Sequence, residues 1–453
     1  MNFLVLNGSP KGKYSITLQT SLYLEILHPE HSFEIYNVGA KIKLLEKDMS
    51  DLKSAIEKAD VLVFSYPVYT FLATAQMHRL IELLHGENME LGEKYATQIT
   101  TSKHFYDVTA HKYIEENCLD LGLRYVRGLS ADMEDLSTEK GRIEAEKFFD
   151  YLMFSIDNGF YASAKKEKSN FIPAKLDYTP LGHEKSEGDV VIIADLEEKD
   201  ESLRAMIDCF RDKLSRKSRI VNIRELGIMG GCLGCFGCAI DGKCVYKDGF
   251  DSFLRERIQT ADSMVYAFKV SDHSMGAMFK TYDDRQFCNG HRTVTIGMPI
   301  GYLVSGKLSS EENLKKVLEA RADVGNNFLA GVATDETDPL SEIEMLAKTL
   351  DYALDKKHVE PQRFYGIGGM KIFRDLIWQM RGMMRADHKF YKKHKQYDFP
   401  QKRKGTVLKM YLVGMLLSSK KIKAKMGNKM NEGMIAPYKK ALDIARERVN
   451  GKS

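Results

Sequence analysis

The sequence predicts an α/β protein with two doubly wound parallel sheets in tandem and a basic, mainly helical C-terminal tail. The first observation is the alternation of short apolar runs with helical patterns over residues 1–157, which is typical of a parallel sheet with crossover helices. The second is that this alternation restarts near residue 188, so the same topology is expected twice. The third is the charge of residues 361–453, where 23 Lys and Arg stand against 6 Asp and Glu.

The length of 453 residues exceeds one ordinary hydrophobic core, so several domains are expected. A charged run at 165–168 and the residues Pro173 and Pro180 indicate a linker between the two sheets. We therefore place the first domain at 1–157, the linker at 158–187, the second domain at 188–360 and the tail at 361–453.

The composition favours a cytoplasmic protein. No secretory signal opens the sequence, and the strongly apolar run at 410–417 is far shorter than the roughly 20 residues that span a bilayer. Seven cysteines, four of them between 232 and 244, do not suggest the even disulfide framework of a secreted domain. We expect a cytoplasmic chain, and a position peripheral to the inner face of the membrane is one reading of its basic tail.

In the first copy, the expected strands are 3–6, 32–37, 61–65, 95–101 and 124–127. The expected helices begin at Ser15 and cover 48–59, 71–84 and 138–154. In a doubly wound sheet, the loops after the first and third strands flank the point where the strand order reverses, which is where ligands bind.

The first of these loops has the features of a phosphate site. Residues 7–10 end the strand, Gly12 allows a tight backbone, and Ser15 is a suitable helix N-cap. The first amides of a helix lack internal acceptors and the helix dipole favours an anion, so this geometry binds phosphate. The loop matches neither common glycine-rich nucleotide motif, and one terminal phosphate suits a mononucleotide such as FMN. An ordinary strand-to-helix turn is the alternative.

These residues resemble a known family. Asn7-Gly8-Ser9-Pro10 with Ser15 and Thr17 is similar to the phosphate loop of the flavodoxin-like NAD(P)H-dependent FMN reductases, and Tyr66-Pro67-Val68-Tyr69 is similar to their second flavin loop. The resemblance covers about residues 1–150 and, more weakly, 187–360. It implies two tandem flavodoxin-like sheets, FMN as cofactor, NAD(P)H as cosubstrate, and a small-molecule or protein electron acceptor. It implies no catalytic side chain, because the flavin carries the chemistry.

The resemblance also implies a set of cofactor-binding residues. Hydroxyls and helix amides would hold the phosphate, and the second loop would contact the isoalloxazine ring. A histidine in the loop after the fourth strand is more often a surface residue, but this loop lies near the same edge. The full set is Ser9, Pro10, Lys11, Ser15, Ile16, Thr17, Pro67, Val68, Tyr69, Ser102 and His104.

The second copy departs from this pattern. Its expected strands are 190–194, 219–223, 263–268, 293–298 and 328–332, and its expected helices are 201–214, 250–260, 311–322 and 340–354. The loop after its first strand, residues 194–201, is rich in Asp and Glu, which would repel a phosphate. We therefore expect no flavin phosphate in this copy.

The second copy carries a compact cysteine motif instead. Cys232, Cys235, Cys238 and Cys244 lie in a glycine-rich loop, where thiolates can surround a metal. The spacing resembles that of iron–sulfur flavoproteins, which implies a [4Fe–4S] cluster. Zinc, redox-active thiols and inert thiols are the alternatives, and zinc is less favoured because structural zinc sites use separated pairs.

The tail combines apolar and basic segments. Residues 370–390 have apolar residues at helical spacing with basic residues between them, 407–417 is apolar, and 420–429 is basic. Two readings stay open: amphipathic helices that pack on the second domain, or contact with an anionic membrane surface. Nucleic acid is unlikely, because no binding motif accompanies the charge.

The predicted function is that of an NAD(P)H-dependent FMN oxidoreductase, either a flavin- or quinone-type reductase or an iron–sulfur flavoprotein. One alternative is a flavodoxin-like electron carrier that a protein partner reduces. Another is a non-catalytic scaffold that docks on membranes. The sequence does not identify the final electron acceptor or distinguish NADH from NADPH, and a homodimer is compatible with it.

Overall fold

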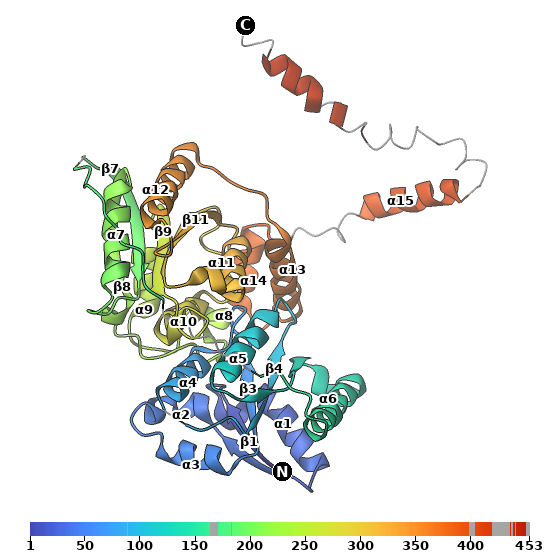
Figure 1. The fold of residues 1–453 in the computed structure, drawn as a ribbon. Helices are drawn as coiled ribbons and strands as arrows, with labels where there is room; N and C mark the ends of the chain where they lie inside the picture. The colour runs from blue at the N-terminus through green and yellow to red at the C-terminus, as the bar shows by residue number, and fades with distance from the viewer. Residues whose placement is uncertain are drawn as a thin grey trace. The chain divides into compact units, whose positions relative to one another are not determined.

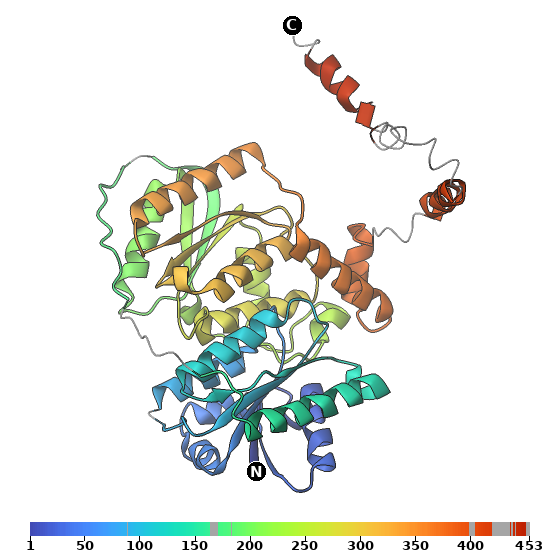
Figure 2. The same cartoon turned by 45° about the vertical axis from the view of Figure 1, so that its right-hand side comes forward.

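The structure is a computed structural model that describes residues 1–87, 89–163, 171–182, 184–397, 404–418, 435, 438–439 and 441–449. It forms two units, Met1–Tyr391 and Lys392–Ser453, and the first unit contains both sheets (Figures 1 and 2). The domain boundaries expected at 157, 187 and 360 stay predictions. The charged run at 165–168 and the basic stretch at 420–429 lie outside the described residues.

The first sheet is parallel, with the order β2-β1-β3-β4-β5 and with β6 paired to β4. The fifth strand is split into two short pieces, each paired to β4. The strands are β1 (Asn2–Asn7), β2 (Ser32–Tyr36), β3 (Val61–Pro67), β4 (Tyr95–Ser102), β5 (Arg124–Tyr125) and β6 (Leu129–Asp132). The helices are α1 (Ile16–Leu27), α2 (Val38–Leu45), α3 (Ser50–Lys58), α4 (Ala75–Gly86), α5 (Val108–Asp120) and α6 (Glu139–Asp157).

Both faces of this sheet are buried, because successive side chains of a strand point to opposite sides. Phe3 and Val5 of β1 pack in a core with α1 and α6. Leu4 and Leu6 pack in a second core with α3, α4 and α5. Strand β1 is therefore apolar from Phe3 to Leu6 because helices cover both faces of the sheet, as the sequence predicts.

The second sheet is also parallel, and its order β11-β10-β9-β7-β8 repeats that of the first. The predicted fold class, two tandem flavodoxin-like sheets, is confirmed. The strands are β7 (Ser186–Ala194), β8 (Arg216–Asn222), β9 (Ser263–Lys269), β10 (Pro299–Ser305) and β11 (Phe328–Thr334). The helices are α7 (Glu201–Lys213), α8 (Gly237–Asp241), α9 (Phe250–Phe253), α10 (Gly276–Arg285), α11 (Glu312–Val324) and α12 (Pro339–Lys356).

The strand predicted at 293–298 is wrong. That segment is a loop, in which Val294 and Ile296 are exposed, and the strand begins at Pro299. Proline suggests the end of a strand in the sequence, but a strand tolerates proline at its first residue, where the missing amide costs little.

The two copies share one continuous core. Helix α4 of the first copy packs against α10, its equivalent in the second, and α5 packs against α11, its equivalent. Equivalent elements thus meet each other across the junction, as in a two-fold symmetric dimer. The single chain contains both halves of this arrangement.

The first unit, which ends at Tyr391, includes α13 and most of α14 from the predicted tail. The helical spacing at 370–390 corresponds to two helices, because α13 (Phe364–Gln379) begins earlier and α14 (Arg385–Lys393) is separate. Glycines near the start of α13 suggest a flexible segment, yet Gly366 N donates to the Asp323 carboxylate at 2.7 Å and Gly369 lies against Phe105. The glycines serve close contact with both copies.

The described part of the second unit contains α15 (Lys404–Leu417). Among the described residues, every helix is too short or too polar to cross a membrane.

Candidate functional site

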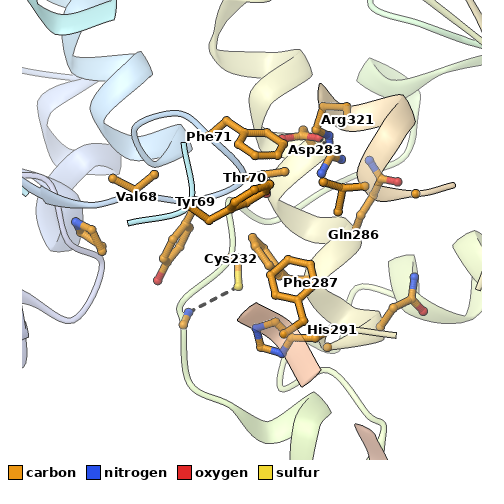
Figure 3. Close-up of a pocket in the computed structure, with 18 of the residues that line it drawn as sticks. Val68, Tyr69, Thr70, Phe71, Cys232, Asp283, Gln286, Phe287, His291 and Arg321 are labelled. Carbon is orange, nitrogen blue, oxygen red and sulfur yellow. Dashed lines mark hydrogen bonds and ion pairs between the residues drawn. The ribbon is translucent and has the colours of Figure 1, made fainter. Parts of the chain in front are cut away.

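A cavity of about 410 Å³ lies at the carboxyl ends of β1, β3 and β4, and both copies line it (Figure 3). Its volume is within the range of sites that bind small cofactors. The structure brings most of the predicted flavin residues to this cavity and leaves Pro10 and His104 out of its lining. The predicted residues that line it are Ser9, Lys11, Ser15, Ile16, Thr17, Pro67, Val68, Tyr69 and Ser102.

The first loop presents hydrogen-bond donors to this cavity. Ser15 is the N-cap of α1, and its hydroxyl accepts from Leu18 N at 3.3 Å. Within the described part of the chain, the amides of Ile16 and Thr17 have no acceptor, so they are free to bind an anion. Gly12 has φ +53°, the left-handed conformation that favours glycine.

The second loop is a strained turn. Tyr69 and Leu72 exchange backbone hydrogen bonds, while Thr70 and Phe71 have φ of +51° and +74°. Such conformations cost on the order of 1–3 kcal/mol each and persist only where the surroundings hold them. Thr109 Oγ1 holds this turn by donating to Phe71 O at 2.6 Å. Thr70 and Phe71 were not predicted as site residues, because nothing in their side chains signals a positive φ.

The second copy supports this turn through a buried lysine. Lys280 of α10 is fully buried; its ammonium donates to Tyr69 O at 3.0 Å and pairs with Asp283 and Asp284. Asp284 also accepts from Ala75 N at 2.8 Å, at the start of α4. Burial raises the pKa of Asp284 to about 6, although the Lys280 ammonium opposes this rise.

Helix α10 was not predicted, and its charges explain why. A run with Lys280, Asp283, Asp284 and Arg285 reads as an exposed segment, but all four side chains are buried. Arg285 pairs with Asp248 at 2.7 Å, and Asp283 is also bound by Arg321, which lines the cavity. Buried charges are tolerated when they are paired in this way.

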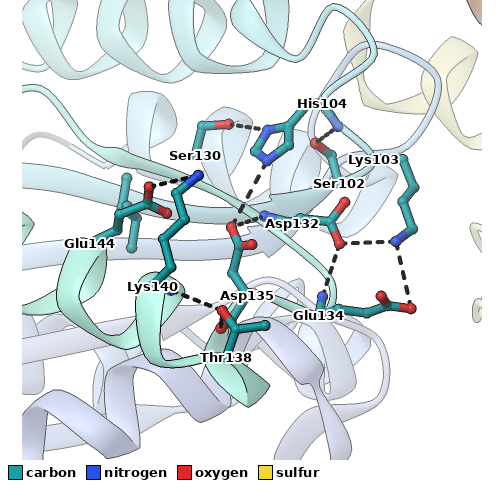
Figure 4. Close-up of polar contacts among 12 residues, drawn as sticks. Ser102, Lys103, His104, Ser130, Asp132, Glu134, Asp135, Thr138, Lys140 and Glu144 are labelled. Atoms are coloured by element: carbon teal, nitrogen blue, oxygen red, sulfur yellow. Dashed lines mark hydrogen bonds and ion pairs between the residues drawn. The ribbon is translucent and has the colours of Figure 1, made fainter.

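His104 lies beside the cavity in a polar network of its own (Figure 4). Its Nδ1 is 3.5 Å from the Asp107 carboxylate and its Nε2 is 3.9 Å from that of Asp135. Ser130 contacts the same ring, and Ser102 Oγ donates to Asp107 at 2.9 Å. These contacts account for the position of the His104 ring without a contact to a cofactor.

In the second copy, the loop equivalent to the phosphate loop is residues 194–201, and acidic side chains in it already have partners within the protein. Asp195 pairs with Arg224, and Asp200 pairs with Lys269 at 3.0 Å. The buried Asp335 carboxylate accepts from Ser202 Oγ at 2.6 Å, with two further donors from 305–306. The carboxylates occupy the position that an anion would need, which supports the expectation of no flavin phosphate here.

The cysteine loop adjoins the cavity. Cys232 and Cys238 line it, while all four motif cysteines and Cys288 line a neighbouring cavity of about 30 Å³. Burial raises the pKa of Cys232 to about 12 and that of Cys238 to about 11. Among the described residues, no three cysteine sulfurs lie within 4.8 Å of one another.

The opposite wall of the cavity is aromatic and comes from the second copy and from α13. Phe373 of α13 packs edge-on against His291 with ring centroids 5.2 Å apart, and Phe287 packs edge-on against the same ring at 6.4 Å. Phe287 also contacts Tyr69 of the turn, with ring centroids 5.7 Å apart, so the aromatic wall and the turn at 69–72 meet at this point.

The fold and the cavity define a doubly wound α/β protein with one mononucleotide-type site at the point where the strand order reverses. Residues 1–113 match the family model described as NADPH-dependent FMN reductase. The resemblance that the phosphate loop implies is therefore confirmed for these residues. No curated protein sequence matches the chain.

Several solved structures are similar to the chain. One is the apo form of an NADH:FMN oxidoreductase, with 18% identity and a TM-score of 0.31, over 36% of this chain and 91% of the other. An NAD(P)H:quinone oxidoreductase from Methanothermobacter marburgensis has 15% identity and a TM-score of 0.29, over 39% and 100%. An FMN-dependent NADH-azoreductase from Bacillus anthracis, in complex with FMN, has 12% identity and a TM-score of 0.26, over 35% and 100%.

Proposed function

We propose that the chain is an NAD(P)H-dependent FMN oxidoreductase of the flavin- or quinone-reductase type, with one FMN in the first copy. The observation that carries this proposal is the phosphate loop, whose hydroxyls and free helix amides face the cavity, in the part of the chain that matches the FMN reductase family. When bound, FMN would accept a hydride from NAD(P)H and pass the electrons to an acceptor.

The residues of the chain would bind and orient the flavin. Ser9, Ser15 and Thr17 would donate to the phosphate together with the amides of α1. The backbone of the strained turn at 69–72, fixed by Lys280, would contact the ring. The matching loop of the second copy is occupied by carboxylates, so one flavin per chain is expected.

The test is to measure flavin content and turnover on the full chain. We expect one FMN per chain, and oxidation of NADH or NADPH that depends on an added quinone. Protein that takes up no FMN on reconstitution would contradict the proposal. A flavin that NADH and NADPH cannot reduce would favour an electron carrier, and a colourless scaffold would favour a non-catalytic role.

An iron–sulfur flavoprotein is the second candidate, because four thiols line one small cavity beside the flavin cavity. No comparison supports the cluster. If Cys232, Cys235, Cys238 and Cys244 hold [4Fe–4S], anaerobic protein should contain about four irons, and replacing any ligand by Ala should remove most of them. Cys209→Ala in α7 is the matched control and should lose none. Iron-free protein after anaerobic reconstitution would exclude the cluster.

The C-terminal tail suggests where the enzyme acts. Helix α15 is 14 residues long and mostly apolar, with Lys404 and Lys409 as its basic residues, and further basic residues flank it in the sequence. We propose that it binds the surface of an anionic membrane, where each basic residue near the lipid contributes about 1 kcal/mol. The exposed apolar side chains are Val407, Leu408, Met410, Tyr411, Leu412, Met415 and Leu416.

Sedimentation with vesicles tests the membrane proposal. The full chain should sediment with vesicles that contain phosphatidylserine and be released by salt, whereas a chain ending at Tyr397 should stay in solution. Equal sedimentation of the two chains would contradict the proposal. The cut at Tyr397 keeps α14 and also α13, whose Ile372, Phe373 and Leu376 line the cavity and would be lost with a cut near residue 360.

A further inference from the structure

A buried carboxylate of α14 holds one loop of the cavity wall. Asp387 is fully buried, accepts from His291 N at 3.1 Å, and lies 3.2 Å from His291 Nδ1. Tyr391 Oη fixes the same residue by donating to His291 O at 2.9 Å. Gly290 permits this approach, because a Cβ at that position would lie 2.3 Å from the Asp387 carboxylate.

The ring of His291 is presented to the cavity (Figure 3). It packs edge-on against Phe287 and Phe373, and its Nδ1 is engaged by Asp387. Within the described residues, His291 Nε2 has no protein partner. A carboxylate that engages one ring nitrogen fixes the ring orientation, so that the other nitrogen, Nε2, can exchange a proton with a ligand in the cavity.

The other charged and titratable groups around this ring are few. Arg292 Nη1 is 3.7 Å from Asp387 Oδ1, and its guanidinium also donates to the carbonyls of Cys238 and Cys288. The Cys238 thiol belongs to the facing loop and donates to Phe287 O at 2.9 Å. The positive charge of Arg292 balances the negative charge of the Asp387 carboxylate. The pair formed by His291 and Asp387, called the dyad below, is therefore not simply an anionic patch.

We propose that His291, positioned by Asp387, donates a proton to the electron acceptor in this cavity. The inference rests on the proposed function and names the class of acceptor, a flat carbonyl compound of the quinone type that fits the aromatic wall. Asp387 is a positioning residue, and the ring contacts with Phe373 and Phe287 also hold the imidazole in place.

The step balances for a quinone. The quinone gains two electrons and two protons. When bound, reduced FMN would supply a hydride, which carries two electrons and one proton and would form an O–H bond at one carbonyl oxygen. His291 would supply the second proton: an O–H bond forms at the other carbonyl oxygen as the His291 Nε2–H bond breaks, and the two carbonyl π bonds are lost as the ring becomes aromatic. The neutral imidazole keeps Nδ1–H on Asp387 and regains its Nε2 proton from water.

Rapid mixing of reduced full-length protein with 1,4-benzoquinone tests the proposal. His291→Gln should lower the rate of flavin reoxidation by about 10²–10⁴-fold, because glutamine cannot transfer a proton to the acceptor. Asp387→Asn should reduce this rate as well, and in both variants the rate of flavin reduction by NADPH should fall far less than the rate of reoxidation. An unchanged rate of reoxidation in His291→Gln would overturn the proposal.

A second readout separates this inference from the proposed function. In ¹⁵N NMR of the flavin-free and flavin-loaded full chain, Asp387→Asn should shift the His291 ring signals, and Asp375→Asn on the exposed side of α13 should not. Unshifted signals in Asp387→Asn would refute the dyad even if the enzyme proves to be a flavin reductase. Absence of NAD(P)H-dependent flavin reduction with shifted signals would count against the proposed function and leave the dyad supported.

Discussion

The first loops of the two copies have the same place in the same sheet order and opposite chemistry. Around Ser15, hydroxyls and unpaired helix amides face a cavity. Around Asp200, the carboxylates already have partners: Asp195 pairs with Arg224, and Asp200 pairs with Lys269. The Asp335 carboxylate accepts a hydrogen bond from Ser202. A doubly wound sheet therefore supplies the place for a nucleotide, and the side chains of one loop decide whether anything binds there.

The second copy, whose matching loop carries paired carboxylates, contributes to the cavity through other residues. Its helix α10 supplies Lys280 to the turn at 69–72 of the first copy, and its loop at 290–295 forms part of the cavity wall. In the proposed function, the first copy binds the flavin, while the second copy supports the turn at 69–72 and covers the cavity. The predictions below test this division, from the largest expected effect to the smallest.

The largest effect is expected for Ser15→Asp. Aspartate is as good an N-cap as serine, so the helix should stay intact, but a fixed negative charge would stand beside the FMN phosphate. FMN affinity should fall by at least about 100-fold, as measured by fluorescence titration. Thr138→Asp, at the N-cap of α6 and away from the cavity, is the matched control and should keep one FMN per chain. Retention of FMN by Ser15→Asp would place the flavin elsewhere.

The next effect concerns the support from the second copy. Lys280→Met would leave the buried carboxylates of Asp283 and Asp284 without their ammonium partner and the Tyr69 carbonyl without its donor. The free energy of unfolding should fall by about 3–5 kcal/mol in urea denaturation. Lys348→Met removes an exposed pair with Glu344 and should change it by less than about 0.5 kcal/mol. Equal effects of the two changes would show that Lys280 is not a structural link between the copies.

Particular residues show how far the sequence could predict this molecule. The sheet order and the phosphate loop could be predicted, because apolar runs and a Ser15 cap are local signals. Lys280, Asp387 and the turn at 70–71 could not, because their roles depend on partners more than 30 residues away or on backbone angles that side chains do not encode. The start of α13 was missed for the same reason: its glycines serve contacts with Phe105 and Asp323, which are distant in the sequence.

A pH-dependent effect is expected where His273 joins the copies. Its Nε2 is 3.4 Å from Asp120 of α5, and its Nδ1 is 3.0 Å from Glu311, next to α11. Burial acts to lower the pKa of His273, but hydrogen bonds to Asp120 and Glu311 outweigh it and raise the pKa to about 10. A folded pKa above the unfolded value near 6.5 stabilises the protein fully below about pH 6.5, and this contribution is lost as pH rises through about 10.

The measurement is the free energy of unfolding of the parent and of His273→Gln across this window. The parent should be more stable by about 2 kcal/mol at pH 6, and the difference should shrink toward pH 10. His358→Gln, whose ring is 4.0 Å from Glu360 near the surface, should show no such trend. A pH-independent difference between parent and His273→Gln would contradict the ion-pair account.

The smallest effect compares the matching serines of the two loops. Ser15→Ala removes an N-cap, and Ser202→Ala removes one of the donors to Asp335, so each should lower the free energy of unfolding by about 1 kcal/mol. Only Ser15→Ala should also weaken FMN binding, by about 5- to 10-fold, because one hydroxyl donor to the phosphate is lost. Since the stability cost is matched, the flavin affinity alone distinguishes the two loops. A comparable loss of FMN affinity in Ser202→Ala would mean that the second loop also contributes to the flavin site.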